Sequence, residues 1–169
     1  MNIYHVGNTS VNLYLLDSGT HRLLIDSGYP GQLSLLGREM RKTGFKISDI
    51  DYLMVTHFHV DHAGAIQELK NQGVKFILPD IQISSIEPMQ QMMIGKWHYT
   101  PLNRSDNMIL TLKESRYFLK KLNISGQVIS TPGHSDDSIT LLLDTGEAFT
   151  GDLMREEFIL NESSQEKKS

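Results

Sequence analysis

The hydrophobic pattern at the start of the chain predicts three short strands. Residues 2–6, 11–17 and 21–26 are rich in aliphatic and β-branched side chains, which favour extended backbone. The turn sequence Asp17-Ser18-Gly19-Thr20 separates the last two strands. We therefore expect these two strands to form a hairpin.

The next part of the chain repeats apolar positions with helical and then with strand spacing. Residues 32–42 place apolar side chains on one helical face. A strand is expected at 52–55, a helix at 63–71 and a second strand at 74–78. This order of strand, helix and strand is typical of a βαβ unit.

The pattern is harder to interpret between residues 80 and 122. Residues 81–96 have a helical composition, although Pro88 requires either a helix start or a kink at that point. Residues 100–108 are expected to be irregular and 114–122 to be helical. Met89, Met92, Met93, Ile94, Trp97 and Tyr99 suit either the apolar wall of a substrate pocket or an ordinary packed helix.

Three further strands are expected at 127–130, 138–144 and 147–150. The chain shows no internal repeat and no linker, and 169 residues suit one domain. We therefore predict a single domain over 1–160 and a polar C-terminal tail over 161–169.

Composition narrows the classes of function. The chain contains no cysteine, which excludes disulfides, thiolate metal sites and a cysteine nucleophile. Any metal must therefore be held by histidine and carboxylate side chains. The net charge of −4, without a sustained Lys/Arg stripe, weighs against nucleic acid as a partner.

The sequence gives no sign of a targeting or membrane segment. Residues 1–10 lack the basic start and apolar run of a signal peptide. The longest apolar runs, 13–16 and 139–143, are far shorter than the roughly 20 residues that span a bilayer. We expect a cytoplasmic protein that acts on a small molecule and has no membrane partner.

The strongest candidate site is the motif His57-x-His59-x-Asp61-His62, directly after the strand expected at 52–55. Residues i and i+2 of an extended segment project to the same side, so His57 and His59 can face one metal ion. Asp61 and His62 are then turned toward a neighbouring position. The motif can therefore supply two ligands to each of two adjacent ions.

Two weaker motifs also follow expected strands. His134 lies in Thr131-Pro132-Gly133-His134-Ser135, and Asp152 lies in Gly151-Asp152. Alone, a single histidine is usually structural and a Gly-Asp pair is usually a turn. Their positions in loops after strands resemble that of the first motif, and functional loops of a sandwich gather along one edge.

Together these motifs closely resemble those of the metallo-β-lactamase superfamily, as does Leu23–Gly28 with Asp26 in its acidic position. The resemblance implies an α/β fold, a four-layer αββα sandwich with a dinuclear metal site at one edge. It also implies a ligand set for each ion: His57, His59 and His134 for the first, and Asp61, His62 and Asp152 for the second, with Asp152 bridging.

The chain departs from the family pattern at its end. Family members usually carry another strand, a final histidine ligand and a closing helix after the Gly-Asp motif, but no histidine follows His134 here. Either the chain lacks its C-terminal end or it is a natural minimal variant. We favour the first, with the second half of the sandwich shortened. An open sheet edge would then invite a homodimer. His5, His21 and His98 are alternative sources of the last ligand, although each suits an ordinary strand or loop.

The resemblance predicts a hydrolase that uses one or two zinc ions, with manganese or iron as alternatives. A metal-bound hydroxide would cleave an ester-like bond, with Asp61 orienting the water. Histidine at 59, where di-iron relatives carry Glu, favours zinc. The compact His134 loop resembles those of glyoxalase II-like thioesterases and lactonases. A non-catalytic metal-binding or regulatory module of the same fold is the alternative.

Overall fold

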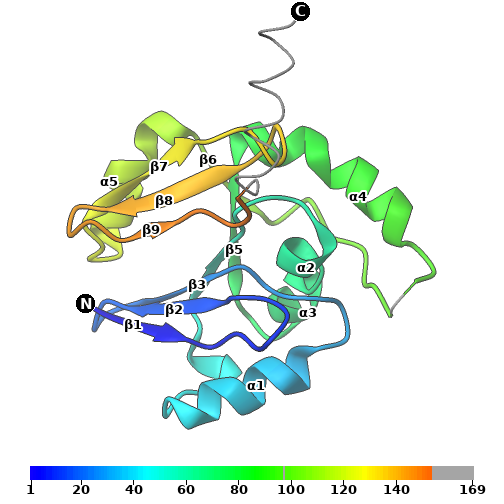
Figure 1. Ribbon diagram of the computed structural model, residues 1–169, viewed down its shortest axis with the longest axis horizontal. Helices are drawn as coiled ribbons and strands as arrows, with labels where there is room; N and C mark the ends of the chain where they lie inside the picture. The colour runs from blue at the N-terminus through cyan, green and yellow to red at the C-terminus, as the bar shows by residue number, and fades with distance from the viewer. Residues whose placement is uncertain (97, 154–169) are drawn as a thin grey trace, which may run out of the picture.

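The computed structural model describes residues 1–96 and 98–153, which form two stacked β-sheets with helices around them (Figure 1). The first sheet has its strands in chain order: β1 (Asn2–His5), β2 (Tyr14–Asp17), β3 (Arg22–Ile25), β4 (Tyr52–Met54), β5 (Lys75–Pro79) and β6 (Met108–Leu110). Strands β1 to β3 pair antiparallel, and β3 to β6 pair parallel. The second sheet is the antiparallel set β7 (Gly126–Ser130), β8 (Ile139–Leu143) and β9 (Ala148–Phe149).

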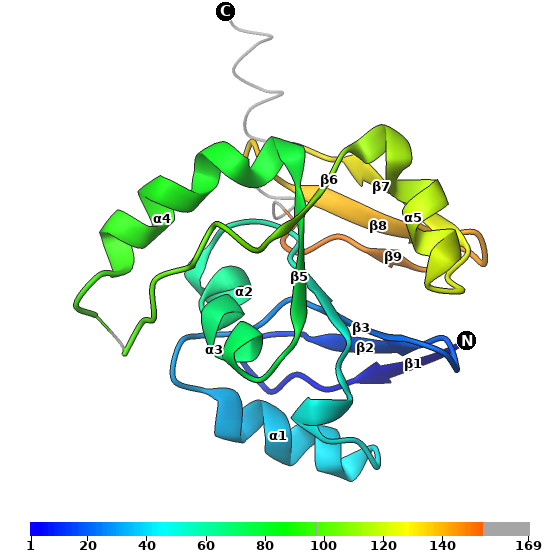
Figure 2. The same cartoon turned by 180° about the vertical axis from the view of Figure 1, so that it is seen from behind.

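The helices cover the sheets from different sides. The α-helices are α1 (Leu33–Lys42), α2 (Val60–Ala63), α3 (Ile66–Asn71), α4 (Ile86–Met93) and α5 (Ser115–Lys121), and the 3₁₀ turns are η1 (Ile47–Asp49), η2 (Asp80–Ser85) and η3 (Leu112–Glu114). Helix α1 lies below β1 to β3 in Figure 1, on the side away from β7 to β9. The buried side chains of α3, Ile66 and Leu69, belong to the same core as those of α1. Figure 2 shows α5 beside β7 on the other side, and its Phe118 ring meets Tyr52 of β4 edge to face, 6.2 Å between centroids.

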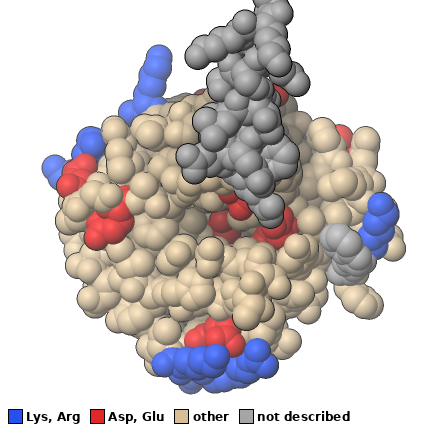
Figure 3. All heavy atoms as spheres, in the orientation of Figure 1, with Lys and Arg blue, Asp and Glu red and all other residues tan. Residues whose placement is uncertain are grey.

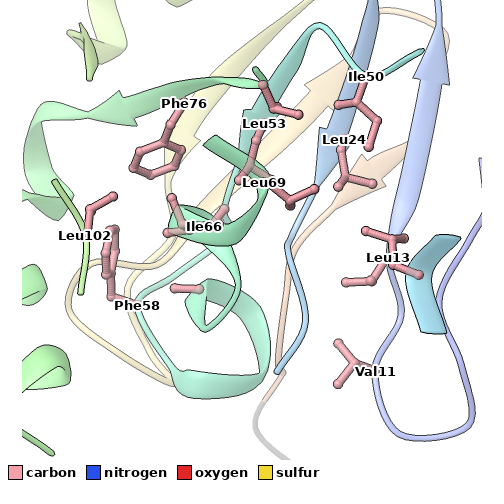
Figure 4. Packing of buried hydrophobic residues seen from close by; sticks show 14 of the residues in the cluster. Val11, Leu13, Leu24, Ile50, Leu53, Phe58, Ile66, Leu69, Phe76 and Leu102 are labelled. Atoms are coloured by element: carbon pink, nitrogen blue, oxygen red, sulfur yellow. The ribbon is translucent and has the colours of Figure 1, made fainter. Parts of the chain in front are cut away.

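Apolar side chains on the two faces of the first sheet belong to two separate hydrophobic cores. Leu24 and Leu53 point toward α1 and α3, whereas Leu23 and Met54 point toward the second sheet. Successive strand residues face opposite sides, so each of the four central strands, β2 to β5, contributes to both cores. Figure 4 shows the helix-side core, where the labelled side chains Leu24, Leu53, Ile66, Leu69 and Phe76 gather.

The predicted α/β sandwich of two sheets is confirmed, as are the hairpin of β2 and β3 and the parallel pairing of β4 with β5. Residues 154–160 of the predicted domain and the tail 161–169 lie outside the described residues, so that division stays a prediction. Within the described part of the chain, no helix has the length and apolar character needed to cross a membrane.

The single helix expected over 63–71 is wrong, because the structure breaks it into α2 and α3. The amide of Ala65 does not follow the hydrogen-bond pattern of a helix. It donates instead to the Gly28 carbonyl at 3.2 Å and to the Ser27 hydroxyl at 3.1 Å, both in the loop after β3. A Cβ at Gly64 would lie 2.5 Å from Pro30 Cδ. Close contact with the loop after β3 therefore decides the break.

The segment after β5 differs in two ways from the expectation. Strand β6 was not expected: it begins at Met108, the last residue of the segment expected to be irregular, and its three residues are too few for a strand pattern to stand out. Met89 and Met93 are buried in the helix-side core, so the ordinary packed helix is correct for them and the substrate wall is not. Pro88 lies in the first turn of α4, where a missing N–H is tolerated. Trp97 lies outside the described residues.

The helix-side core should dominate stability. Leu53→Ala removes a fully buried side chain, and we expect the free energy of unfolding to fall by about 2–5 kcal/mol. Ile109→Ala is the matched control, since that side chain is 56% exposed and its loss should change the value by less than about 0.5 kcal/mol. Denaturant unfolding of both variants measures the difference, and equal losses would contradict this account of the core.

Candidate metal centre

The candidate ligands converge on one edge of the stacked sheets. Parallel strands β3 and β4 end at the same edge, and His57, His59 and His62 follow β4 directly. His134 lies in the loop between β7 and β8, and Asp152 follows β9. The centre therefore combines loops from both sheets.

Three histidine rings form the first group. His57 Nε2 lies 3.0 Å from His59 Nδ1, and His134 Nε2 lies 2.9 Å from the same His59 atom. One ring nitrogen from each of the three lies within 4.8 Å of the others. His57 is buried, whereas His134 is exposed. The group is therefore anchored in the protein on one side and reached by solvent on the other.

A second group shares His57 with the first. It joins His57, His62 and Asp152, whose ligand atoms also lie within 4.8 Å of one another. Asp152 Oδ1 is 3.2 Å from His62 Nε2, and its other oxygen is 3.6 Å from His134 Nε2. Asp152 therefore lies between the two groups. Asp61 Oδ2 is 3.5 Å from His62 Nε2, beside the second group.

Asp26 supports both groups from behind. It is buried at the end of β3 with a φ of 65°, a left-handed conformation that Asp tolerates better than most residues. Its Oδ1 accepts a 2.6 Å hydrogen bond from the Thr56 amide, and its Oδ2 accepts a 2.8 Å bond from His62 Nδ1. The Thr56 hydroxyl also lies 3.0 Å from Oδ2. One carboxylate thus fixes the end of β4 and the ring of His62.

These contacts set which nitrogen of each ring faces the centre. Because the Thr56 hydroxyl donates to the Asp26 carboxylate, it is left to accept from His57 Nδ1, 3.1 Å away. The Nε2 lone pair of a neutral His57 then points at His59. His62 donates through Nδ1 to Asp26, so its Nε2 faces Asp152 and Asp61.

The charges in the centre are strongly coupled. Burial, reinforced by the neighbouring rings of His62, His59 and His134, lowers the pKa of His57 to about 3. Burial alone would lower the pKa of His62, but its hydrogen bonds with Asp26 and Asp61 outweigh burial and raise that pKa to about 10. Burial raises the pKa of Asp26 despite its bonds to His62 and Thr56. The hydrogen bond with His62 lowers the pKa of Asp61.

The donor set fits a metal ion. Three imidazole nitrogens that face one another at 2.9–3.0 Å need a proton or a cation between them. One metal ion satisfies all three lone pairs at once, and imidazole with carboxylate oxygen is a ligand set that zinc accepts. The carboxylates of Asp152 and Asp61 add negative charge beside it.

A hollow adjoins the second group. It has a volume of about 500 Å³, and its lining includes Asp26, Asp61, His62 and Asp152 together with the apolar Tyr14 and Phe149. Figure 3 shows acidic side chains gathered in a hollow near the middle of this face, with basic side chains toward the rim. The approach to the centre is therefore acidic.

Thr56 and Gly151 are residues that the sequence reasoning missed as parts of the centre. Gly151 has a φ of 69°, and a Cβ there would lie 2.5 Å from Thr56 Oγ1 and 3.1 Å from His57 Nδ1. Only glycine allows the segment before Asp152 to pass so close. A hydroxyl directly before His57 was the available signal for Thr56. His5 and His21 bond instead to Asn12 and Thr20.

Comparison with known proteins agrees with this geometry. The family model described as the metallo-β-lactamase superfamily matches residues 6–75. A probable metallo-hydrolase of Methanocaldococcus jannaschii is 31% identical over 146 residues, covering 85% of this chain and 66% of that protein. An atrochrysone carboxyl ACP thioesterase of Aspergillus fumigatus is 30% identical over 149 residues, covering 83% and 39%.

The fold comparison gives the same result. The native FEZ-1 metallo-β-lactamase from Legionella gormanii superposes with a TM-score of 0.69 at 25% identity, covering 88% of this chain and 58% of that one. The chain belongs to the metallo-β-lactamase superfamily, whose members are generally hydrolytic enzymes that bind metal ions. It spans about half the length of the curated relatives that it matches.

Asp26→Ala tests the support behind the ligands. The change removes the acceptor for His62 and Thr56, so we expect zinc affinity to fall roughly 10–100-fold. Competition with a chromophoric chelator measures it. Asp51→Ala is the control, because Asp51 also accepts a hydrogen bond from a backbone amide, that of Arg22. This pair lies where β3 and β4 begin, whereas Asp26 and Thr56 lie where they end. Unchanged affinity in Asp26→Ala would show that Asp26 is only a turn residue.

Gly151→Ala tests the close passage beside Thr56. Gly19→Ala is matched to it, since Gly19 has a φ of 85° but nothing within 4 Å of an added Cβ. Both variants should lose about 1–2 kcal/mol of stability from the left-handed backbone, and Gly151→Ala should lose more because its Cβ meets Thr56. Only Gly151→Ala should also weaken zinc binding, by about tenfold or more. Equal zinc affinity in the two variants, measured by chelator competition, would rule out the steric argument.

Proposed function

We propose that this protein is a metal-dependent hydrolase that cleaves an ester-like bond in a small molecule. The observation that carries the proposal is the pair of overlapping ligand groups, which share His57 and have Asp152 between them. Two adjacent cation positions with a solvent-exposed side suit hydrolysis better than a closed structural site does.

The residues divide into two sets in this proposal. His57, His59 and His134 would hold the first ion. His62 and Asp152, with Asp61 beside them, would hold the second, with Asp152 shared and His57 next to both positions. Zinc is the proposed metal because the donors are imidazole nitrogens and carboxylate oxygens, with manganese and iron as alternatives. When bound, such ions lower the pKa of water and polarise a carbonyl or phosphoryl oxygen.

Asp61 is the residue that handles the proton of the attacking water. Its side chain is partly exposed, at 26%, next to His62. The hydrogen bond with His62 holds the pKa of Asp61 low, so the carboxylate is ionised at neutral pH and accepts a hydrogen bond. It thereby orients the water toward the substrate.

Thioesters and lactones are the proposed substrates. The thioesterase name of one relative supports a thioester, and the metallo-hydrolase name of another supports hydrolysis more generally. The hollow beside Asp61 and Asp152 has the volume of a small organic ligand. A carbonyl carbon placed there would lie beside the oxygen that Asp61 orients.

The zinc-loaded chain should hydrolyse an acyl thioester or a lactone faster than a β-lactam or an aryl phosphodiester. Asp61→Asn should lower kcat by about 10²–10⁴-fold, the range of general acid–base contributions. His21→Ala, a histidine outside the ligand groups, should leave kcat unchanged. Steady-state kinetics on the four substrates, with metal analysis of each sample, measures both effects.

Two results would overturn this function. A chain that binds zinc at both groups but turns over none of the four substrates would favour a non-catalytic metal-binding module. A chain whose activity is unchanged in Asp61→Asn and after removal of all metal would place the chemistry elsewhere in the molecule.

A further inference from the structure

Two buried polar side chains outside the ligand set join the loops that carry the histidines. Asp137 lies in the β7–β8 loop, three residues after His134, and is 6% exposed. Gln82 lies in η2, after β5, and is completely buried. Neither belongs to the two candidate ligand groups, so the proposed chemistry does not explain why polar groups are buried here.

Asp137 reaches across to the His57 loop. Its Oδ2 accepts a 2.8 Å hydrogen bond from the amide of Phe58, the residue between His57 and His59. Beside it, the Ile139 amide donates to the Thr56 carbonyl at 2.9 Å. Two hydrogen bonds therefore join the loop of the second sheet to the loop of the first. The Asp137 bond lies three residues from His134 on one side and one residue from His57 and His59 on the other.

Gln82 forms hydrogen bonds with the same two loops. Its Nε2 faces three carbonyl oxygens, those of Val55 at 3.1 Å, Thr56 at 3.2 Å and Asp137 at 3.3 Å. An amide flip would turn its oxygen against these three acceptors, so the donor orientation is forced. One side chain thus spans the end of β4 and the loop that carries His134.

The amide oxygen of Gln82 also bears on the role of this residue. Its Oε1 is buried and has no hydrogen-bond partner among the described residues. Burying an acceptor without a partner lowers stability, so what Gln82 contributes at this position is the set of hydrogen bonds that its Nε2 donates to the two loops.

We propose that Gln82 and Asp137 are positioning residues that hold His134 in place against His57 and His59, an inference that rests on the proposed metal site. His134 alone of the three comes from the second sheet. Its 2.9 Å separation from His59 depends on how the two loops are joined. Loosening the joint would spread the three nitrogens without removing any of them.

The test compares two buried glutamines. Gln82→Met keeps the length of the side chain but loses its donors. Gln90→Met is the matched control. Gln90 lies in α4, is also buried, and its Oε1 accepts a 2.6 Å hydrogen bond from the Leu102 amide. Both should lower stability in denaturant unfolding. Only Gln82→Met should weaken zinc binding, by roughly 10–100-fold, and alter the visible absorption spectrum of bound Co²⁺, which reports ligand geometry.

Asp137 gives an independent second arm. Asp137→Ala should weaken zinc and alter the Co²⁺ spectrum in the same direction as Gln82→Met. Asp137→Asn keeps an oxygen that can accept from Phe58 and should restore most of the affinity. This arm also serves if Gln82→Met does not fold.

The outcomes separate this inference from the proposed function. If the unchanged chain binds neither Zn²⁺ nor Co²⁺, both are overturned. If the unchanged chain binds and the Gln82 and Asp137 variants match the Gln90 control in affinity and spectrum, only the positioning role is overturned. Weaker binding and altered spectra confined to the Gln82 and Asp137→Ala variants would support it.

Discussion

The candidate centre depends on the buried carboxylate of Asp26. This one group accepts hydrogen bonds from the Thr56 amide and from the His62 ring, and the Thr56 hydroxyl bonds to it as well. It therefore joins the end of β3 to the end of β4 and to α2. A buried charge that loses its partners is strongly destabilising, so these contacts are mutually required. They also leave His57 Nε2 and His62 Nε2 facing the centre.

The two cores provide the rigid base for this arrangement. Strands β2 to β5 of the first sheet each contribute side chains to the helix-side core and to the core between the sheets. Strand β3 is thus held on both faces and cannot shift without disturbing both cores. Parallel strands β3 and β4 then deliver Asp26 and His57 to the same edge.

The centre exists only where the two sheets stack. The first sheet supplies His57, His59 and His62, and the second supplies His134 and Asp152. Gly151 lets the segment after β9 pass against Thr56. The metallo-β-lactamase fold therefore places its ligands through tertiary packing of two sheets, although the densest motif is a local stretch of six residues.

The sequence by itself determined the elements whose pattern is local. The β2–β3 hairpin and helix α1 follow from alternation and helical spacing, and the cluster at 57–62 predicts four of the six candidate ligands. His134 and Asp152 were added by the resemblance of their motifs to those of the family. Tertiary structure decided what depends on distant partners. The break between α2 and α3 arises because the Ala65 amide bonds to the loop after β3. Gln82 is tied to carbonyls more than 25 residues away along the chain, and no spacing rule links them, because hydrogen bonds between loops depend on where the strands place the backbone.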